Sequence, residues 1–221
     1  MGSAESKQVA GRLHAANLSK VNFPTSFKMS YKGMRALTMV LGDDNNPSSI
    51  VSMPGGWYGD LILYDGPSEE ASPVAVARSG GKMGFYDRIE LAAASPGQMT
   101  TREELRCRSN GWSMAYTFAM AIDQGSLPER FIWRNSRSSE VKGLGEYSRG
   151  WKLVRLGERE EVVAVGAEAK LSSCLSKAGA FQFVGTGATG KLGKGWETMA
   201  VVSFLRIVQK EMQAAITAAG A

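Results

Sequence analysis

A glycine-rich segment near the C-terminus, "VGTGATGKLGKGWE" (184–197), has the residue types of two phosphate-binding motifs. Gly185, Gly187 and Gly190 fit the dinucleotide fingerprint G-x-G-x-x-G, whereas Gly185, Gly190 and Lys191 fit the start of the P-loop, G-x-x-x-x-G-K. Both motifs hold phosphate with backbone N–H groups at the start of a helix. Nucleotide binding is therefore the first chemistry to consider.

The residues around these glycines argue against a nucleotide. Leu192 stands where a P-loop has the Ser or Thr that holds Mg²⁺, and Gly193 and Gly195 disfavour a helix that begins at Lys191. The dinucleotide motif requires a second strand after its helix, and no strand-like run follows here. We expect a turn that leads from the last strand into a helix, with no nucleotide and no other cofactor.

A basic segment, "WRNSRSSEVKGLGEYSRGWKLVRL" (133–156), is the second candidate. Between residues 130 and 155 seven basic and two acidic residues leave an excess of five positive charges, equal to the net charge of +5 of the whole chain. Arginine forks bind phosphate or carboxylate, and indole rings suit a membrane interface. The alternative is a solvated hairpin whose tryptophans pack in the core. The candidate ligand-binding residues are Trp133, Arg134, Arg137, Lys142, Arg149, Trp151 and Lys152, with Trp112 from another strand.

Aromatic residues form the third candidate group. A Pro-Gly-Gly bend at 54–56 presents Trp57 and Tyr58. Trp112 and Tyr116 lie on a nearby strand pattern. Together they could line the mouth of a barrel, a common site for apolar ligands, or they could simply fill the core. If the protein is an enzyme, the candidates for catalytic contacts are Arg134, Tyr58, Tyr116 and Trp57.

The amino-acid composition argues against several kinds of catalytic and metal-binding site. His14 is the one histidine of the chain, so a Ser-His-Asp triad or a multi-histidine metal site would depend on it alone, and we expect no metal. Cys107 and Cys174 lack metal-ligand spacing and are too few for a disulfide framework, which predicts reduced thiols inside the cell. Adjacent glutamates on a strand point to opposite faces and make poor acid–base pairs.

The N-terminus carries no apolar signal region, and no long apolar span occurs elsewhere, so we expect a cytoplasmic protein. The start "MGSAES" nevertheless matches the N-myristoylation pattern, with Gly2 as acceptor and Ser6 at the fixed position. The alternative is an ordinary start that matches by chance. Acylation of Gly2 would add a peripheral membrane contact.

Short apolar runs separated by Gly, Pro and Asn turns indicate strands. "GDLILYDGPSEEASPVAVAR" (59–78) reads as strand, turn and strand, and Asn110–Gly111 is a strong hairpin signal. We expect residues 1–22 to be a polar N-terminal arm and residues 23–216 to be one domain. Its predicted fold is mainly β, an antiparallel barrel of about twelve short strands.

The C-terminal region differs from the rest. Between Met199 and Val208 apolar residues occupy every face of a predicted helix at about 196–216, which indicates a buried helix. At ~1.5 Å per residue it is about 30 Å long, enough to thread a small barrel. Arg206, Lys210 and Glu211 interrupt it too often for a membrane span.

Three segments, "DLILYDGPSEEASPVAVAR", "FIWRNSRSSEVKGLGEYSRGWKLVRL" and "FQFVGTGATGKLGKGWETMAVVSFLRIVQKE", carry a resemblance of layout over about residues 55–212. A barrel closed around an apolar C-terminal helix resembles the tubby C-terminal-like superfamily of tubby domains, LURP-one-related proteins and phospholipid scramblases, in a fungal-type branch. The resemblance implies this fold but no single activity, because tubby domains bind phosphoinositide headgroups and scramblases act on phospholipids. It assigns no site residue.

Two functions follow as hypotheses. The first is a cofactor-independent module that binds an anionic lipid or another hydrophobic ligand. The alternative is a cyclase or isomerase of specialised metabolism, for example a pericyclase, that folds a hydrophobic substrate in a barrel cavity and gains its rate from proximity and orientation. No nucleic-acid-binding module is visible, so no nucleic acid is expected. A filled barrel with a basic exterior favours the first hypothesis, and an apolar chamber favours the second.

Overall fold

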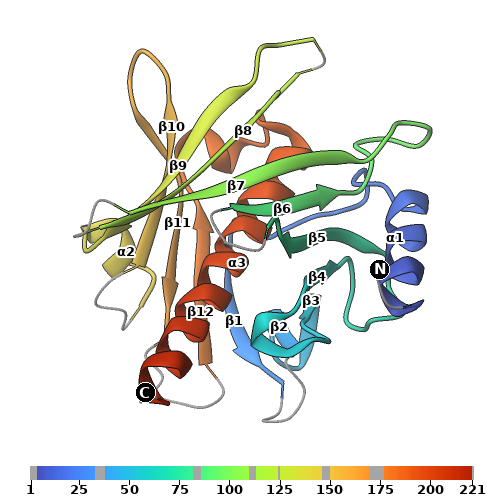
Figure 1. Cartoon of the computed structure of the whole chain (residues 1–221). Coiled ribbons are helices and arrows are strands. Elements are labelled where there is room, and N and C mark those ends of the chain that lie inside the picture. The colour runs from blue at the N-terminus through green and yellow to red at the C-terminus, as the bar shows by residue number, and fades with distance from the viewer. Residues whose placement is uncertain are drawn as a thin grey trace.

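The protein is described from a computed structural model over residues 4–32, 38–81, 86–109, 113–123, 125–145, 150–169 and 177–220. These residues form twelve strands that pair antiparallel in a closed ring, in the order β1-β12-β11-β10-β9-β8-β7-β6-β5-β4-β3-β2 (Figure 1). The ring is closed because β1 pairs with both β2 and β12. The predicted antiparallel barrel is confirmed.

The strands are β1 (Ser26–Tyr31), β2 (Thr38–Asp43), β3 (Asn46–Ser52), β4 (Leu61–Tyr64), β5 (Pro73–Ser79), β6 (Tyr86–Leu91), β7 (Thr101–Ser109), β8 (Met114–Met120), β9 (Glu129–Ser136), β10 (Gly150–Leu156), β11 (Glu161–Glu168) and β12 (Lys177–Phe183). The helices are α1 (Ala4–Ala15), α2 (Ser139–Lys142) and α3 (Gly193–Ala219), with 3₁₀ turns η1 (Gly56–Tyr58) and η2 (Gly185–Thr189).

Helix α3 runs through the barrel, as predicted from its apolar surface. Every residue from 196 to 209 is buried, so the helix is covered around its whole circumference. Phe204 packs on Phe181 of β12 with ring centroids 5.7 Å apart, and Arg206 contacts Asp87 of β6, on the opposite side of the ring. Figure 1 shows α3 passing between the strands. The predicted range of 196–216 is slightly shorter than the observed helix.

Alternation along the strands decides which side chains meet α3. In β9, Phe131 and Trp133 are buried, whereas Ile132 and Arg134 are partly exposed on the outer face. Gly166 of β11 faces the helix, and a Cβ atom there would lie 2.4 Å from the ring of Phe204. This glycine therefore lets the helix approach the barrel wall where Phe204 packs.

Residues 1–22, expected to be a polar arm, contain helix α1. Val9 and Leu13 of α1 are buried in the same core cluster as the barrel residues, and α1 contacts β5. Arg12 fixes the helix by donating from Nη2 to the carbonyl oxygens of Glu69, at 2.7 Å, and Ala71, at 2.5 Å. Helix α1 has only about one buried apolar residue in each turn. Such a sparse apolar pattern is hard to recognise among polar neighbours in the sequence.

Candidate functional site

The predicted basic hairpin consists of the neighbouring strands β9 and β10, and their register separates its tryptophans from its cations. Trp133 pairs with Leu153 on the inner face, and its Nε1 donates to Ser203 Oγ of α3 at 2.9 Å. Trp151 is also buried, at 1% exposure. The structure thus places both tryptophans in the core, as the alternative interpretation of this segment described.

Two cations of the same strands, Arg134 and Lys152, face outward and form a row with a residue of β7. In consecutive cross-strand pairs, Arg108 lies opposite Ala115, Ala115 opposite Arg134, and Arg134 opposite Lys152. Neighbouring strands are about 4.8 Å apart, so the row crosses four strands within about 15 Å. The adjacent outward row begins with Arg106 and is otherwise uncharged, with Thr117, Ile132 and Val154.

One carboxylate already binds Arg134, the central cation of this row. Glu160 accepts hydrogen bonds from Nη1 and Nη2 of Arg134, both at 2.7 Å, and side chains of both residues are well exposed. This bidentate contact raises the pKa of Arg134 and lowers the pKa of Glu160. Exposed ion pairs of this kind contribute little to stability. A phosphate group could therefore replace Glu160 at small cost to the fold.

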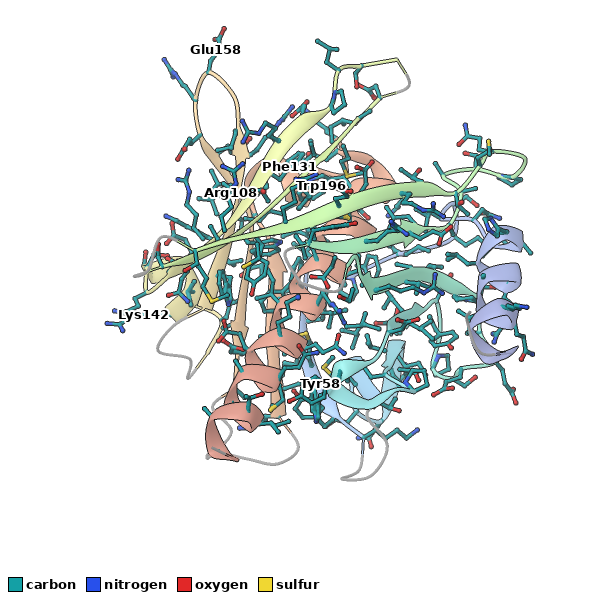
Figure 2. The ribbon with its side chains drawn as sticks, viewed as in Figure 1. Tyr58, Arg108, Phe131, Lys142, Glu158 and Trp196 are labelled. Atoms are coloured by element: carbon teal, nitrogen blue, oxygen red, sulfur yellow. The ribbon has the colours of Figure 1, made fainter. Side chains whose placement is uncertain are left out.

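Two further cations extend the row beyond the end of β9. Arg137, two residues before α2, and Lys142, the last residue of α2, are exposed, and Figure 2 shows Lys142 toward the same side of the molecule as Arg108. Glu140 of α2 is the second nearby carboxylate, and a hydrogen bond from Ser138 lowers its pKa. We call the five cations the basic face: Arg108, Arg134, Arg137, Lys142 and Lys152. Against Glu140 and Glu160 they leave an excess of three positive charges. Trp112 and Arg149, the other predicted ligand-binding residues, lie outside the described residues.

The aromatic catalytic candidates do not converge on one site with Arg134. Tyr116 is buried on the inner face of β8, its ring edge-on to Trp151 at 5.5 Å, and burial raises the pKa of its hydroxyl. Tyr58 is exposed, and its Oη lies 3.0 Å from Thr217 Oγ1 of α3. Trp57 is half-buried, and its carbonyl accepts from Gln209 Nε2 at 2.9 Å. Trp57 and Tyr58 thus anchor the C-terminal half of α3, whereas Arg134 faces outward.

An interior charge network was not predicted from the sequence. Asp87 Oδ1 accepts from Arg206 Nε at 3.0 Å and Nη2 at 2.8 Å, and Lys210 Nζ lies 3.0 Å from Asp87 Oδ2. Arg206 Nη1 also donates to the carbonyl of Gly59 at 3.1 Å. The Asp87 and Arg206 side chains are 1% and 3% exposed. The network fastens α3 to β6 and to the η1 turn, and it joins residues that lie 119 positions apart in the sequence.

The glycine-rich segment forms η2 and the start of α3. Helix α3 begins at Gly193 rather than at the Gly-Lys of a P-loop, in agreement with the predicted turn between the last strand and the helix. Gly187 packs closely, since a Cβ there would lie 2.1 Å from the Val163 carbonyl oxygen.

Within the described ranges, no group of three or more His, Cys, Asp or Glu side chains is arranged to hold a metal ion. No helix in this part of the chain is long and apolar enough to cross a membrane. Gly2, the predicted acylation site, lies outside the described residues. The resemblance to the tubby C-terminal-like superfamily stays a prediction, because no protein-family model matches the chain and no curated protein or solved structure is significantly similar to it.

Proposed function

We propose that this protein binds the anionic surface of a phospholipid membrane through its basic face. The observation that supports the proposal is the alignment of Arg108, Arg134 and Lys152 in one outward row across β7–β10. Half-exposed Ala115 lies between Arg108 and Arg134, and half-exposed Ile132 lies in the adjacent row, so the side chains beside these cations are uncharged.

The filled interior also favours binding on the outside. Fourteen consecutive residues of α3 are buried along the barrel axis, and aromatic side chains such as Phe131 and Trp196 pack there at 5.8 Å between ring centroids (Figure 2). The alternative, a ring-closing enzyme, needs an interior chamber for its substrate. The packing along α3 leaves this alternative without support, and we do not propose it.

The charge of the basic face sets the expected strength. A basic residue near an anionic bilayer contributes about 1 kcal/mol, so an excess of three positive charges gives about 3 kcal/mol. That free energy corresponds to roughly 150-fold tighter binding to an anionic than to a neutral bilayer. Because the charges are exposed, the attraction should weaken strongly as ionic strength rises and the Debye length shortens.

The test is co-flotation with vesicles of phosphatidylcholine alone and with added phosphatidylserine or phosphoinositide. The variant Arg108→Gln/Lys152→Gln removes two charges of the row and should bind anionic vesicles roughly 30-fold more weakly. A matched control, Lys28→Gln/Lys177→Gln, removes two exposed charges from β1 and β12 instead, and should lose much less binding.

The variant Glu160→Gln should change vesicle binding in the opposite direction. It frees the Arg134 guanidinium from its carboxylate and should strengthen binding to anionic vesicles. The proposal is wrong if the unmodified chain floats with no anionic vesicle at low salt. It is also wrong if the β1–β12 control loses as much binding as the Arg108–Lys152 variant.

A further inference from the structure

A pocket of about 250 Å³ lies beside the glycine-rich segment, and none of the residues of the basic face lines it. Its walls come from residues 22–25, from Phe183 at the end of β12, from η2 and the turn after it, and from the first turns of α3. The lining residues are Asn22, Phe23, Thr25, Phe183, Gly187, Ala188, Thr189, Gly190, Lys194 and Glu197.

The η2 wall of this pocket is held in place by the strand beneath it. Glu161 of β11 accepts from the Thr186 backbone N–H at 2.8 Å and from Thr186 Oγ1 at 2.9 Å. Gly190 has φ +73°, a conformation that side-chain-bearing residues rarely adopt, and a Cβ there would come within 4.0 Å of Glu197 Oε1. The absence of a side chain at this position keeps the space in front of Glu197 open.

Glu197 gives the pocket an incompletely satisfied carboxylate. The residue is only 7% exposed, and Lys194 Nζ donates to its Oε2 at 2.9 Å. No described residue donates to Oε1, which belongs to a side chain that lines the pocket. Oε1 is not one of the buried oxygens that lack a partner, so it is accessible at the pocket surface and can accept from an N–H group of a ligand.

The neighbouring surface is positive. The Lys194 ammonium has three donors, of which the contact with Glu197 uses one. Helix α3 is 27 residues long, and it begins without a side-chain cap or an acidic residue in its first turn. The N-terminal end of its dipole therefore adds to the attraction for an anionic group.

We propose that this pocket binds a small zwitterion of the size of a free α-amino acid. Its ammonium group donates to Glu197 Oε1, its carboxylate lies against Lys194 and the start of α3, and its side chain contacts Phe23 and Phe183. This arrangement places four charges in alternating order, so each charge of the ligand meets one of opposite sign. The volume is below the ~300–1,000 Å³ of sites for drug-sized ligands, which suits an amino acid better than a nucleotide or a lipid.

The experiment is a titration of the ¹⁵N-labelled protein with each of the common α-amino acids, followed by NMR. The amide signals of Gly187, Gly190, Gly193 and Gly195 report on the site. Butylamine and butyrate, which carry one charge each, are the comparison probes. At least one amino acid should give saturable shifts at these glycines, with an affinity at least tenfold higher than that of either single-charge probe.

Variants decide whether the binding occurs at this pocket. Glu197→Gln and Lys194→Met should each weaken the binding at least tenfold, and Lys191→Met, a neighbour outside the lining, should leave it unchanged. Thr25→Trp adds a large side chain at an exposed residue of the lining and should abolish binding while Lys194 and Glu197 themselves stay unchanged. Thr25→Trp therefore keeps the test decisive if either charge variant fails to fold.

The proposal is overturned if no amino acid shifts these glycines at concentrations up to about 10 mM, the weak end of specific binding. It is equally overturned if binding survives in Thr25→Trp, or if butylamine or butyrate binds as tightly as the amino acid. Vesicle binding by the basic face is measured separately, so failure of one proposal leaves the other standing.

Discussion

Neutralising Asp87 should destabilise the protein more than loss of an exposed carboxylate. Asp87→Asn keeps an oxygen that can accept from Arg206, so the substitution removes mainly the charge. Arg206 is then a buried cation with no counter-charge, whereas Lys210, whose side chain is 19% exposed, can turn toward water. Loss of one partner of a buried pair costs about 3–5 kcal/mol, and the escape of Lys210 places the expected loss near 3 kcal/mol.

The assay is urea unfolding followed by tryptophan fluorescence, with the m-value as a check that unfolding stays two-state. For a chain of this length, a loss of about 3 kcal/mol lowers Tm by roughly 6–12 °C. The control is Glu104→Gln, which breaks the exposed pair of Glu104 with Arg106 and should change stability by less than about 1 kcal/mol.

The double variant Asp87→Asn/Arg206→Met removes both buried charges, and it should recover at least part of the stability lost in Asp87→Asn. A loss below about 1 kcal/mol in Asp87→Asn would refute the reasoning, because it would mean that the Arg206 charge is not held in a water-poor interior. An equal loss in Glu104→Gln would refute it as well.

Three other predictions concern the core, the pH dependence of stability and the glycine-rich segment. Leu205 lies fully buried in the middle of α3, so Leu205→Ala should reduce the free energy of unfolding by about 2–5 kcal/mol in denaturant titrations. Burial raises the pKa of Glu103 to about 7, whereas the unfolded chain releases this proton near its ordinary value of 4.5. Glu103 therefore lowers stability as pH rises from about 4.5 to 7, and Glu103→Gln should raise Tm at pH 8 but not at pH 4. Calorimetric titration with Mg-ATP or a nicotinamide dinucleotide should give no saturable heat, and micromolar binding that disappears in Lys191→Ala would contradict this expectation.

Structural features that depend on residues close together in the chain could be predicted from the sequence. Short apolar runs between turn residues predicted the antiparallel barrel, and apolar residues on every face of the C-terminal segment predicted the buried helix. In both cases the repeat of the element itself, two residues in a strand and 3.6 in a helix, carries the information. The same alternation, applied to "FIWRNS", separates Trp133 from Arg134 by face, although the sequence interpretation grouped them as one surface.

Features that depend on distant partners were decided by the tertiary structure. Arg206 was counted as an interruption of an apolar helix, and it is buried because Asp87, 119 residues earlier in the chain, meets it across the barrel interior. Arg108 was not considered, and it joins Arg134 and Lys152 because the register of β7–β10 aligns them. Val9 and Leu13 looked like isolated apolar residues in a polar arm, and the exterior of β5 gives them a surface to cover. The sequence by itself determined the periods of the elements, but the pairing of a buried charge or an aligned row of cations depends on strand register and ring closure, which only the fold sets.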